Sequence, residues 1–112
     1  MRVILLVFAW ISLVAVPVLA QVVERKPDPV HGKKLAERLC VNCHLVDSTQ
    51  KEVNVDIPSF REIAKKQGQT EGAIIAHIFL PKHPMPQISL TASELADIAA
   101  YIVQLRDRRP SH

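Results

Sequence analysis

The chain has 112 residues, room for one small domain, and a formal net charge of +3 with an aromatic content of 4%. The basic residues are scattered without interleaved aromatic side chains, and no nucleic-acid-binding motif is present, so nothing indicates a nucleic-acid partner. Two cysteines are too few for the disulfide framework that stabilises many small exported domains, and this favours stabilisation by a bound cofactor.

Residues 1–20 have the layout of a secretory signal peptide. A single basic residue, Arg2, precedes an uncharged apolar run that ends in small residues at Val18 and Ala20. We therefore predict cleavage between Ala20 and Gln21 and a location in the bacterial periplasm. The alternative is an uncleaved membrane anchor, because an apolar run of about 18 residues is close to the length that spans a bilayer. Membrane contact is expected only in that case.

The exported part begins with residues 21–29, which are polar and contain prolines, and these features predict an extended lead-in. A first helix is expected from Pro29 or Val30 to Val41, because its apolar residues recur at helical spacing and its charged residues take the other face. The apolar face consists of Leu35, Ala36, Leu39 and Cys40.

A loop over residues 45–58 separates this helix from two short ones. The second helix is expected to start at or just after Pro58 and to stop at Gly68. The third is expected to start after Thr70, which is a suitable N-cap. The apolar residues that should face inward are Phe60, Ile63 and Ala64 in the second helix, and Ile74, Ile75 and Ile78 in the third.

The last helix has the clearest pattern. Residues 81–90 hold three prolines and must form a stiff extended loop. Thr91 and Glu94 then form a Thr-x-x-Glu capping box that starts the helix. Its apolar residues are Leu95, Ile98, Ala99, Ile102 and Leu105, and three arginines follow at its end: Arg106, Arg108 and Arg109. No alternating strand pattern occurs, so we predict an all-α domain over residues 30–108 with a tail over 109–112.

Cys40 and Cys43 lie three positions apart, and His44 follows the second cysteine directly. This pattern predicts covalent attachment of one c-type haem. The two thiols, about one helical turn apart, can reach the two vinyl groups on one edge of a porphyrin. The imidazole of His44 is then held over the ring as the proximal axial ligand of the iron.

Other interpretations of the motif are weaker. A structural zinc site needs four ligands, usually with a second Cys or His pair. A thioredoxin-like dithiol would lie at a strand-to-helix turn, and no strand is predicted. A plain disulfide would not explain the adjacent His44. The remaining histidines are scattered along the chain: His31, His77, His83 and His112.

Met85 is the only methionine after residue 20, and it lies between Pro84 and Pro86. The prolines restrict the backbone on both sides, which predicts a defined direction for the thioether and makes Met85 the expected distal axial ligand. A lone methionine usually fills a hydrophobic gap, but it then lies on a helix or strand. His83 is the competing ligand and would lower the reduction potential; we expect it to lie at the surface.

Taken in order, these segments resemble the small monohaem class I c-type cytochromes. The resemblance is carried by "GKKLAERLCVNCH", "PSF" and "HPMP" with the following "LTASELADIAAYIVQL". It implies the cytochrome c fold, with three to five helices around one covalently bound haem c and with the first and last helices crossing. It also implies thioether bonds at Cys40 and Cys43 and axial ligation by His44 and Met85.

The resemblance gives Gly32 a reason to lack a side chain, because the first helix would cross the last one closely there, and Tyr101 would lie at the same crossing. A main-chain carbonyl, from either Ile57 or Pro58, is expected to accept the ring N–H of His44.

An iron with both axial positions occupied has no open site for a substrate, so we expect a monomeric one-electron carrier and not an enzyme. Its partners would be larger redox proteins. One alternative is a haem-based gas sensor in which Met85 dissociates. Another is a dedicated haem subunit of a dehydrogenase or oxidase, tethered by an uncleaved N-terminal segment. Lysines that could steer an acidic partner are Lys33, Lys34, Lys51, Lys65, Lys66 and Lys82.

Overall fold

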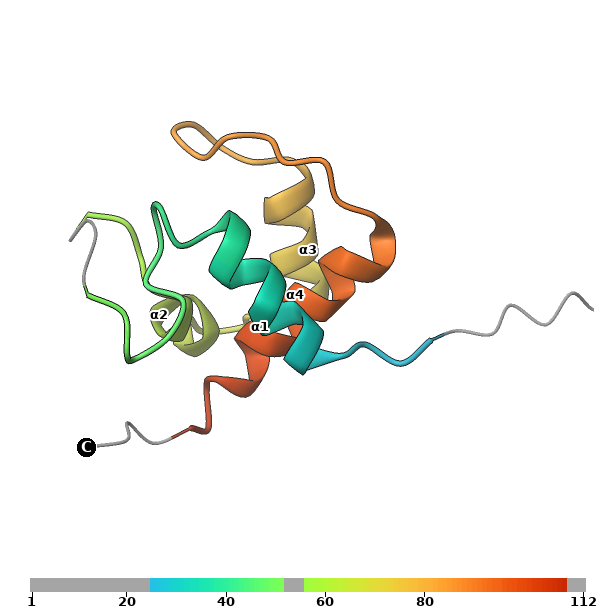
Figure 1. Ribbon diagram of the computed structural model, residues 1–112, viewed down its shortest axis with the longest axis horizontal. Coiled ribbons are helices and arrows are strands. Elements are labelled where there is room, and N and C mark those ends of the chain that lie inside the picture. Colours follow the sequence, from blue (N-terminus) through green and yellow to red (C-terminus); the bar gives the residue numbers. More distant parts are fainter. Residues whose placement is uncertain (1–24, 52–55, 109–112) are drawn as a thin grey trace, which may run out of the picture.

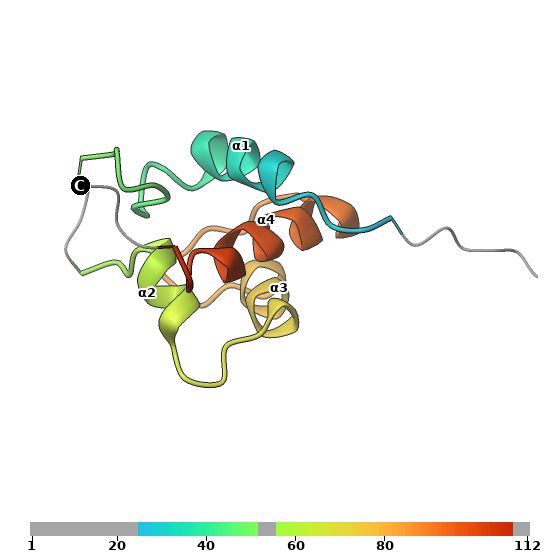
Figure 2. The same ribbon diagram turned by 90° about the horizontal axis from the view of Figure 1, so that it is seen from below.

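The computed structural model describes residues 25–51 and 56–108, and within them the chain forms four helices and no strand. The all-α prediction is therefore confirmed. Figure 1 shows the crossing of the first and last helices at the centre of the molecule, and Figure 2 shows the last helix between the first on one side and the other two on the opposite side. The helices are α1 (Pro29–Leu39), α2 (Phe60–Lys65), α3 (Glu71–Phe79) and α4 (Ala92–Gln104).

Three of the predicted segments lie wholly or partly outside the described residues. These are the signal peptide over residues 1–20, most of the lead-in over 21–29, and the tail over 109–112. Residues 25–28 of the lead-in are described and have no regular secondary structure. No helix in the described part combines the length and the hydropathy needed to cross a bilayer.

Each helix starts at a side-chain cap. The carboxylate of Asp28 accepts the main-chain N–H groups of Val30 and His31 at the start of α1. Thr70 caps α3, and the predicted capping box of Thr91 and Glu94 caps α4. These caps satisfy N–H groups that the first turn of a helix leaves without a main-chain partner.

The second capping box, formed by Ser59 and Glu62, was not predicted from the sequence. It places the start of α2 at Phe60, after Pro58, and the helix ends at Lys65, before Gly68. Gly68 has a positive φ of 72°, which suits a glycine in the turn that follows the helix.

The first helix is shorter than predicted, since it ends at Leu39 and not at Val41. The main-chain N–H groups of Cys43 and His44 both donate to the carbonyl of Cys40, at 3.1 and 2.8 Å, and this arrangement turns the chain away from the helix axis. Leu39 was expected on the buried face, but it is 38% exposed at the end of the helix.

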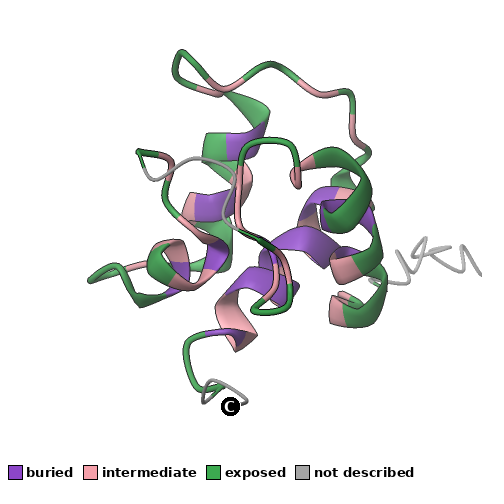
Figure 3. Ribbon diagram, turned by 60° about the vertical axis from the view of Figure 1, so that its left-hand side comes forward, coloured by how far each residue is buried: buried purple, intermediate pink, exposed green. Residues whose placement is uncertain are grey.

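The apolar core is built around α4, and Figure 3 shows buried residues concentrated on this helix and on the faces directed toward it. The predicted apolar positions of α4 are all buried. Tyr101 is buried as well, and its hydroxyl donates to the main-chain carbonyl of Val46 at 2.7 Å. The core consists of Leu35, Ala36, Val46, Phe60, Ala64, Ile74, Ile78, Leu95, Ile98, Ala99, Tyr101, Ile102 and Leu105.

The crossing of α1 and α4 depends on Gly32, as predicted. A Cβ atom at this position would overlap the main-chain carbonyl of Asp97 and lie 2.9 Å from the main-chain nitrogen of Ile98. The two backbones can approach this closely only because residue 32 lacks a side chain. Tyr101 lies one turn further along α4 from Asp97.

Candidate functional site

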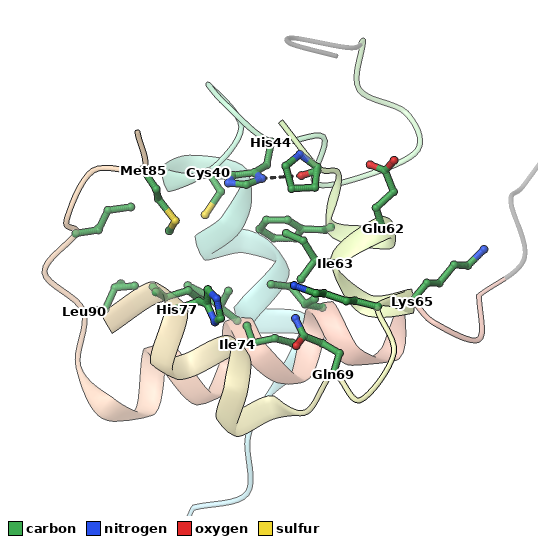
Figure 4. A pocket seen from close by; sticks show the side chains of 17 residues that line it. Cys40, His44, Glu62, Ile63, Lys65, Gln69, Ile74, His77, Met85 and Leu90 are labelled. Carbon is green, nitrogen blue, oxygen red and sulfur yellow. Dashed lines mark hydrogen bonds between the residues drawn. The ribbon is translucent and has the colours of Figure 1, made fainter. Parts of the chain in front are cut away.

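A cavity of about 610 Å³ opens between the end of α1, helices α2 and α3, the loop before α4, and α4 itself. Its volume lies within the range of cofactor and ligand sites. The lining is mainly apolar and includes Phe60, Ile74, Ile98 and Ile102. The close-up in Figure 4 shows Cys40, His44 and Met85 along one edge of the cavity, with Gln69, Ile74 and His77 toward the other.

An adjoining cavity of about 290 Å³ is lined by both cysteines, His44 and Met85. The structure thus brings together all four predicted site residues, although Met85 comes from a loop far along the chain. Leu39 also lines this smaller cavity, and this accounts for its exposure at the end of α1.

Cys40 and Cys43 lie on the turn that follows α1, and both are free thiols. Cys40 is half-buried and Cys43 is exposed. Burial, reinforced by the neighbouring Cys43, raises the pKa of the Cys40 thiol to about 11. The Cys40 thiol is therefore protonated at neutral pH, which is unfavourable for a dithiol of the thioredoxin type, whose nucleophile is a thiolate.

His44 has one ring nitrogen engaged by the protein. Its Nδ1–H donates to the main-chain carbonyl of Pro58 at 2.8 Å, which selects Pro58 over Ile57 as the orienting residue. Nε2 then carries the lone pair and is available to a metal. The ring of Phe60 packs against the imidazole with centroids 5.6 Å apart, so both a hydrogen bond and a packing contact restrain its orientation.

Met85 is half-buried in the loop between α3 and α4 and packs against the hydrophobic core. It lines both cavities, and its main-chain N–H donates to the carbonyl of Lys82 at 3.1 Å. His83 is exposed and lines neither cavity. The structure therefore puts Met85, and not His83, beside the cysteines and His44.

Polar side chains line the cavity at the side away from the cysteines, where Figure 4 shows Gln69 and His77, with Lys65 at the outer rim. From the sequence, His77 needed no functional explanation. Its Nδ1–H donates to the carbonyl of Ala73 at 2.9 Å, within α3. In the sequence, His77 directly precedes Ile78, a residue of the apolar face of α3, and this position at the border of that face was the only signal.

The predicted docking lysines do not share one environment. Lys33 is paired with Asp47 at 2.6 Å, and this hydrogen bond raises the pKa of Lys33 against the opposing effect of burial. The positive charge of Lys33 is thus already paired with a carboxylate of the same protein. The others are exposed: Lys34, Lys51, Lys65, Lys66 and Lys82.

The residues present fit a covalently held haem. A large, mainly apolar cavity is lined by the thiol of Cys40, an imidazole and a thioether, and the second thiol, Cys43, lines the adjoining smaller cavity. Imidazole and thioether are donor types that hold the iron in c-type cytochromes. By contrast, the described part of the chain contains no group of three or more His, Cys, Asp or Glu side chains that could hold a metal ion.

Comparisons with known proteins lead to the same class of protein. The family model described as "Cytochrome c" matches residues 29–106. The chain is also similar to cytochrome c-552 of Bradyrhizobium diazoefficiens, with 37% identity over 79 residues that cover 70% of this chain and 76% of the relative. No solved structure matches the chain significantly. The family match over residues 29–106, together with the four helices of the described part and the contact between the first and last of them, shows that the chain belongs to the cytochrome c family.

Proposed function

We propose that the protein is a one-electron carrier whose single haem c is bound through thioethers at Cys40 and Cys43, with His44 and Met85 as axial ligands of the iron. Membership of the cytochrome c family implies a haem-based electron carrier. The observation that supports the ligand assignment is the convergence of Cys40, His44 and Met85 on one mainly apolar cavity of about 610 Å³.

When bound, the haem supplies the one-electron couple between Fe(III) and Fe(II). The protein's task is then to hold the two ligands unchanged in both oxidation states, so that little has to rearrange when an electron moves. The Pro58 carbonyl serves this by keeping Nδ1 of His44 protonated and the ring in one orientation. The apolar lining excludes water, and the neutral thioether of Met85 favours the reduced, less charged iron.

The haem carries two carboxylates on the edge opposite its thioether bonds. We propose that the Gln69 amide and the Lys65 ammonium, which lie away from the cysteines, interact with these carboxylates, and that His77 lies beside them. A cation or an N–H donor there would offset part of the cost of bringing carboxylates close to an apolar cavity.

We further propose that electrons enter and leave at the edge marked by Cys43 and Leu39, which are both exposed beside the smaller cavity. The partners would be larger redox proteins, reached by a monomer whose cytochrome domain spans residues 30–108. In this proposal residues 1–20 direct the chain to the periplasm and are then removed.

The test is to produce the full chain in a bacterial host that can attach c-type haem. The proposal expects colour that stays with the protein in acidified acetone and an oxidised spectrum with a sulfur-to-iron charge-transfer band in the far red. Colour that is extracted by the solvent would contradict covalent attachment. A coloured protein without the band would contradict Met85 as a ligand.

Two further measurements on the same preparation separate the alternatives. Carbon monoxide should not bind readily at neutral pH if Met85 stays on the iron, whereas a gas sensor should bind it. Sequencing of the mature N-terminus should start at Gln21, while a retained Met1 would favour a tethered haem subunit.

A further inference from the structure

Gln50 makes three hydrogen bonds to the main chain of the segment that carries the haem-binding motif. Its Nε2 donates to the carbonyl of Val41 at 3.0 Å and to the carbonyl of His44 at 3.2 Å. Its Oε1 accepts the main-chain N–H of Val46 at 3.1 Å. Both hydrogens of the amide group and one lone pair are therefore used on this short stretch of backbone.

The two carbonyls need such a donor because of where α1 ends. They follow the last turn of the helix, where carbonyl groups have no intrahelical partner. Within the described residues, no main-chain N–H donates to the carbonyl of Val41 or His44. Gln50, six residues after His44, donates both of these hydrogen bonds. Its single amide group therefore joins the backbone before Cys43 to the backbone after it.

The part of the chain that presents Gln50 is itself anchored. Tyr101 of α4 donates to the carbonyl of Val46, and the main-chain N–H of Gln50 donates to the carbonyl of Asp47 at 3.3 Å. Asp47 is in turn paired with Lys33 of α1. The amide of Gln50 is thus held in place by contacts from both crossing helices.

We propose that Gln50 is a positioning residue for the axial ligand His44. This inference rests on the proposed function, because it concerns the orientation of His44 toward the iron. Pro58 restrains the imidazole through Nδ1, and Gln50 restrains the backbone from which that imidazole projects. Loss of the Gln50 donors would let the turn at Cys43 and His44 relax and would rotate the imidazole relative to the iron.

The test uses the full-length haem protein with Gln50→Leu, which removes all three hydrogen bonds, and Gln50→Glu, which keeps an acceptor for Val46 and loses both donors. Thr49→Val is the control for loop stability, because among the described residues the Thr49 hydroxyl hydrogen-bonds to Asp47 and not to the motif. Gln67→Leu, on the exposed turn after α2, is the control for the substitution itself.

The readouts are the paramagnetically shifted proton resonances of His44 in the oxidised protein, the reduction potential, and hydrogen exchange at Val46. Both Gln50 variants should move the His44 resonances and change the potential. Exchange at Val46 should speed up roughly tenfold in Gln50→Leu, as expected for one lost hydrogen bond, and much less in Gln50→Glu. Thr49→Val should lower the midpoint of thermal unfolding and leave the resonances in place, and Gln67→Leu should change none of these.

The inference fails if the Gln50 variants lose thermal stability as Thr49→Val does, with unchanged resonances and potential, since Gln50 would then only stabilise the turn. A wild-type protein without covalently bound haem would overturn the proposed function, and this inference with it. The state of the wild type therefore tells the two failures apart.

Discussion

Met85 is the residue whose role could least be decided by residue type alone, because a methionine is above all a flexible apolar side chain. Its surroundings give it a more specific role. It lies on a loop between prolines, is half-buried, and lines the same cavity as Cys40 and His44. As the proposed distal ligand, a soft, neutral sulfur would suit an iron that changes its charge by one, and it would help to set the reduction potential.

Replacement of Met85 by Ala should therefore change the electronic properties of the site more than the fold. We expect loss of the sulfur-to-iron band, a lower reduction potential and a gain of carbon monoxide binding at the opened position. Optical titration with a reductant, followed by exposure to carbon monoxide, measures all three. His83→Ala is the matched control, because His83 is exposed and lines neither cavity, and it should leave each property unchanged. Equal effects of the two changes would contradict the assignment of Met85.

The site residues that could be predicted from the sequence are those with a local sequence signal. Cys40, Cys43 and His44 form one short motif, and the two prolines beside Met85 indicate a loop of restricted conformation. The choice of Pro58 over Ile57 and the contacts of Gln50 depend on how the loop over residues 45–58 folds back on the motif that precedes it. No spacing rule encodes that path, because the loop has no periodic pattern that fixes the direction of its side chains.

Among the elements, the crossing of α1 and α4 has the least tolerance for change. Gly32 lies against the main chain of Asp97 and Ile98, and backbone atoms cannot move aside as a flexible side chain can. This contact sets the separation of the two helices. Because Cys40 directly follows α1, the contact also sets the position of Cys40 at the cavity.

Gly32→Ala should therefore destabilise the protein by about 3 kcal/mol, at the upper end of the cost of overpacking a core. For a domain of this size that corresponds to a fall in Tm of roughly 12–24 °C. Gly72→Ala is the matched control within α3, where the added methyl group would meet only the Thr70 hydroxyl at 4.0 Å. It should raise stability by about 0.5–1 kcal/mol through better helix propensity. Thermal unfolding followed by circular dichroism checks both, and a mild effect at Gly32 would show that the helices can separate at little cost.

The helices themselves were predicted well, because amphipathic spacing and capping residues are local signals. Their ends were less accurate: α1 stops before Cys40 because the carbonyl of Cys40 takes part in the next turn, and the cap of α2 at Ser59 was missed. Asp97 was missed altogether as a core residue. An acidic residue in a helix normally faces water, and its burial is possible only because groups distant in sequence donate to it.

At the scale of the whole molecule, Asp97 joins the lead-in, α1 and α4. Its carboxylate is fully buried and accepts hydrogen bonds from Arg25 at 2.8 and 2.9 Å, from the main-chain N–H of Asp28 at 2.7 Å and from His31 at 2.7 Å. Burial works to raise the pKa of Asp97, but the hydrogen bonds from Arg25, Asp28 and His31 outweigh it and lower the pKa below its ordinary value. The carboxylate thus stays charged in the folded protein.

Asp97→Asn should consequently destabilise the protein although the side chain keeps its size. The amide cannot accept on both sides, so Arg25 and the Asp28 N–H would compete for one oxygen. We expect a loss of about 1.5–3 kcal/mol, the range for a lost hydrogen bond to a charged group, because Arg25 and His31 are themselves about half exposed. Chemical denaturation at neutral pH measures this, with the exposed Asp107→Asn as the control that should change stability by less than about 0.5 kcal/mol.

A second carboxylate ties α1 to the loop of the haem motif, and it makes the stability of the molecule dependent on acid. The hydrogen bond from Lys33, supported by those from Thr49, lowers the pKa of Asp47 to about 2. A carboxylate with a lowered folded-state pKa contributes stability that is fully present above its unfolded-state pKa, near 4, and is lost as the pH falls toward 2. Because both partners are partly exposed, we expect a contribution of about 1–2 kcal/mol, less than the full shift would give.

Asp47→Asn should therefore lower the free energy of unfolding at pH 6 and flatten its decline between about pH 4 and 2. The measurement is denaturant unfolding of both proteins across that pH range, followed by the helical signal. The difference between them should shrink as the pH approaches 2, because about half of the wild-type carboxylates are then protonated in the folded protein. A difference that stays constant down to pH 2 would mean that the Asn side chain disturbs the packing of the loop, and that the charge of Asp47 has little part in holding the motif against α1.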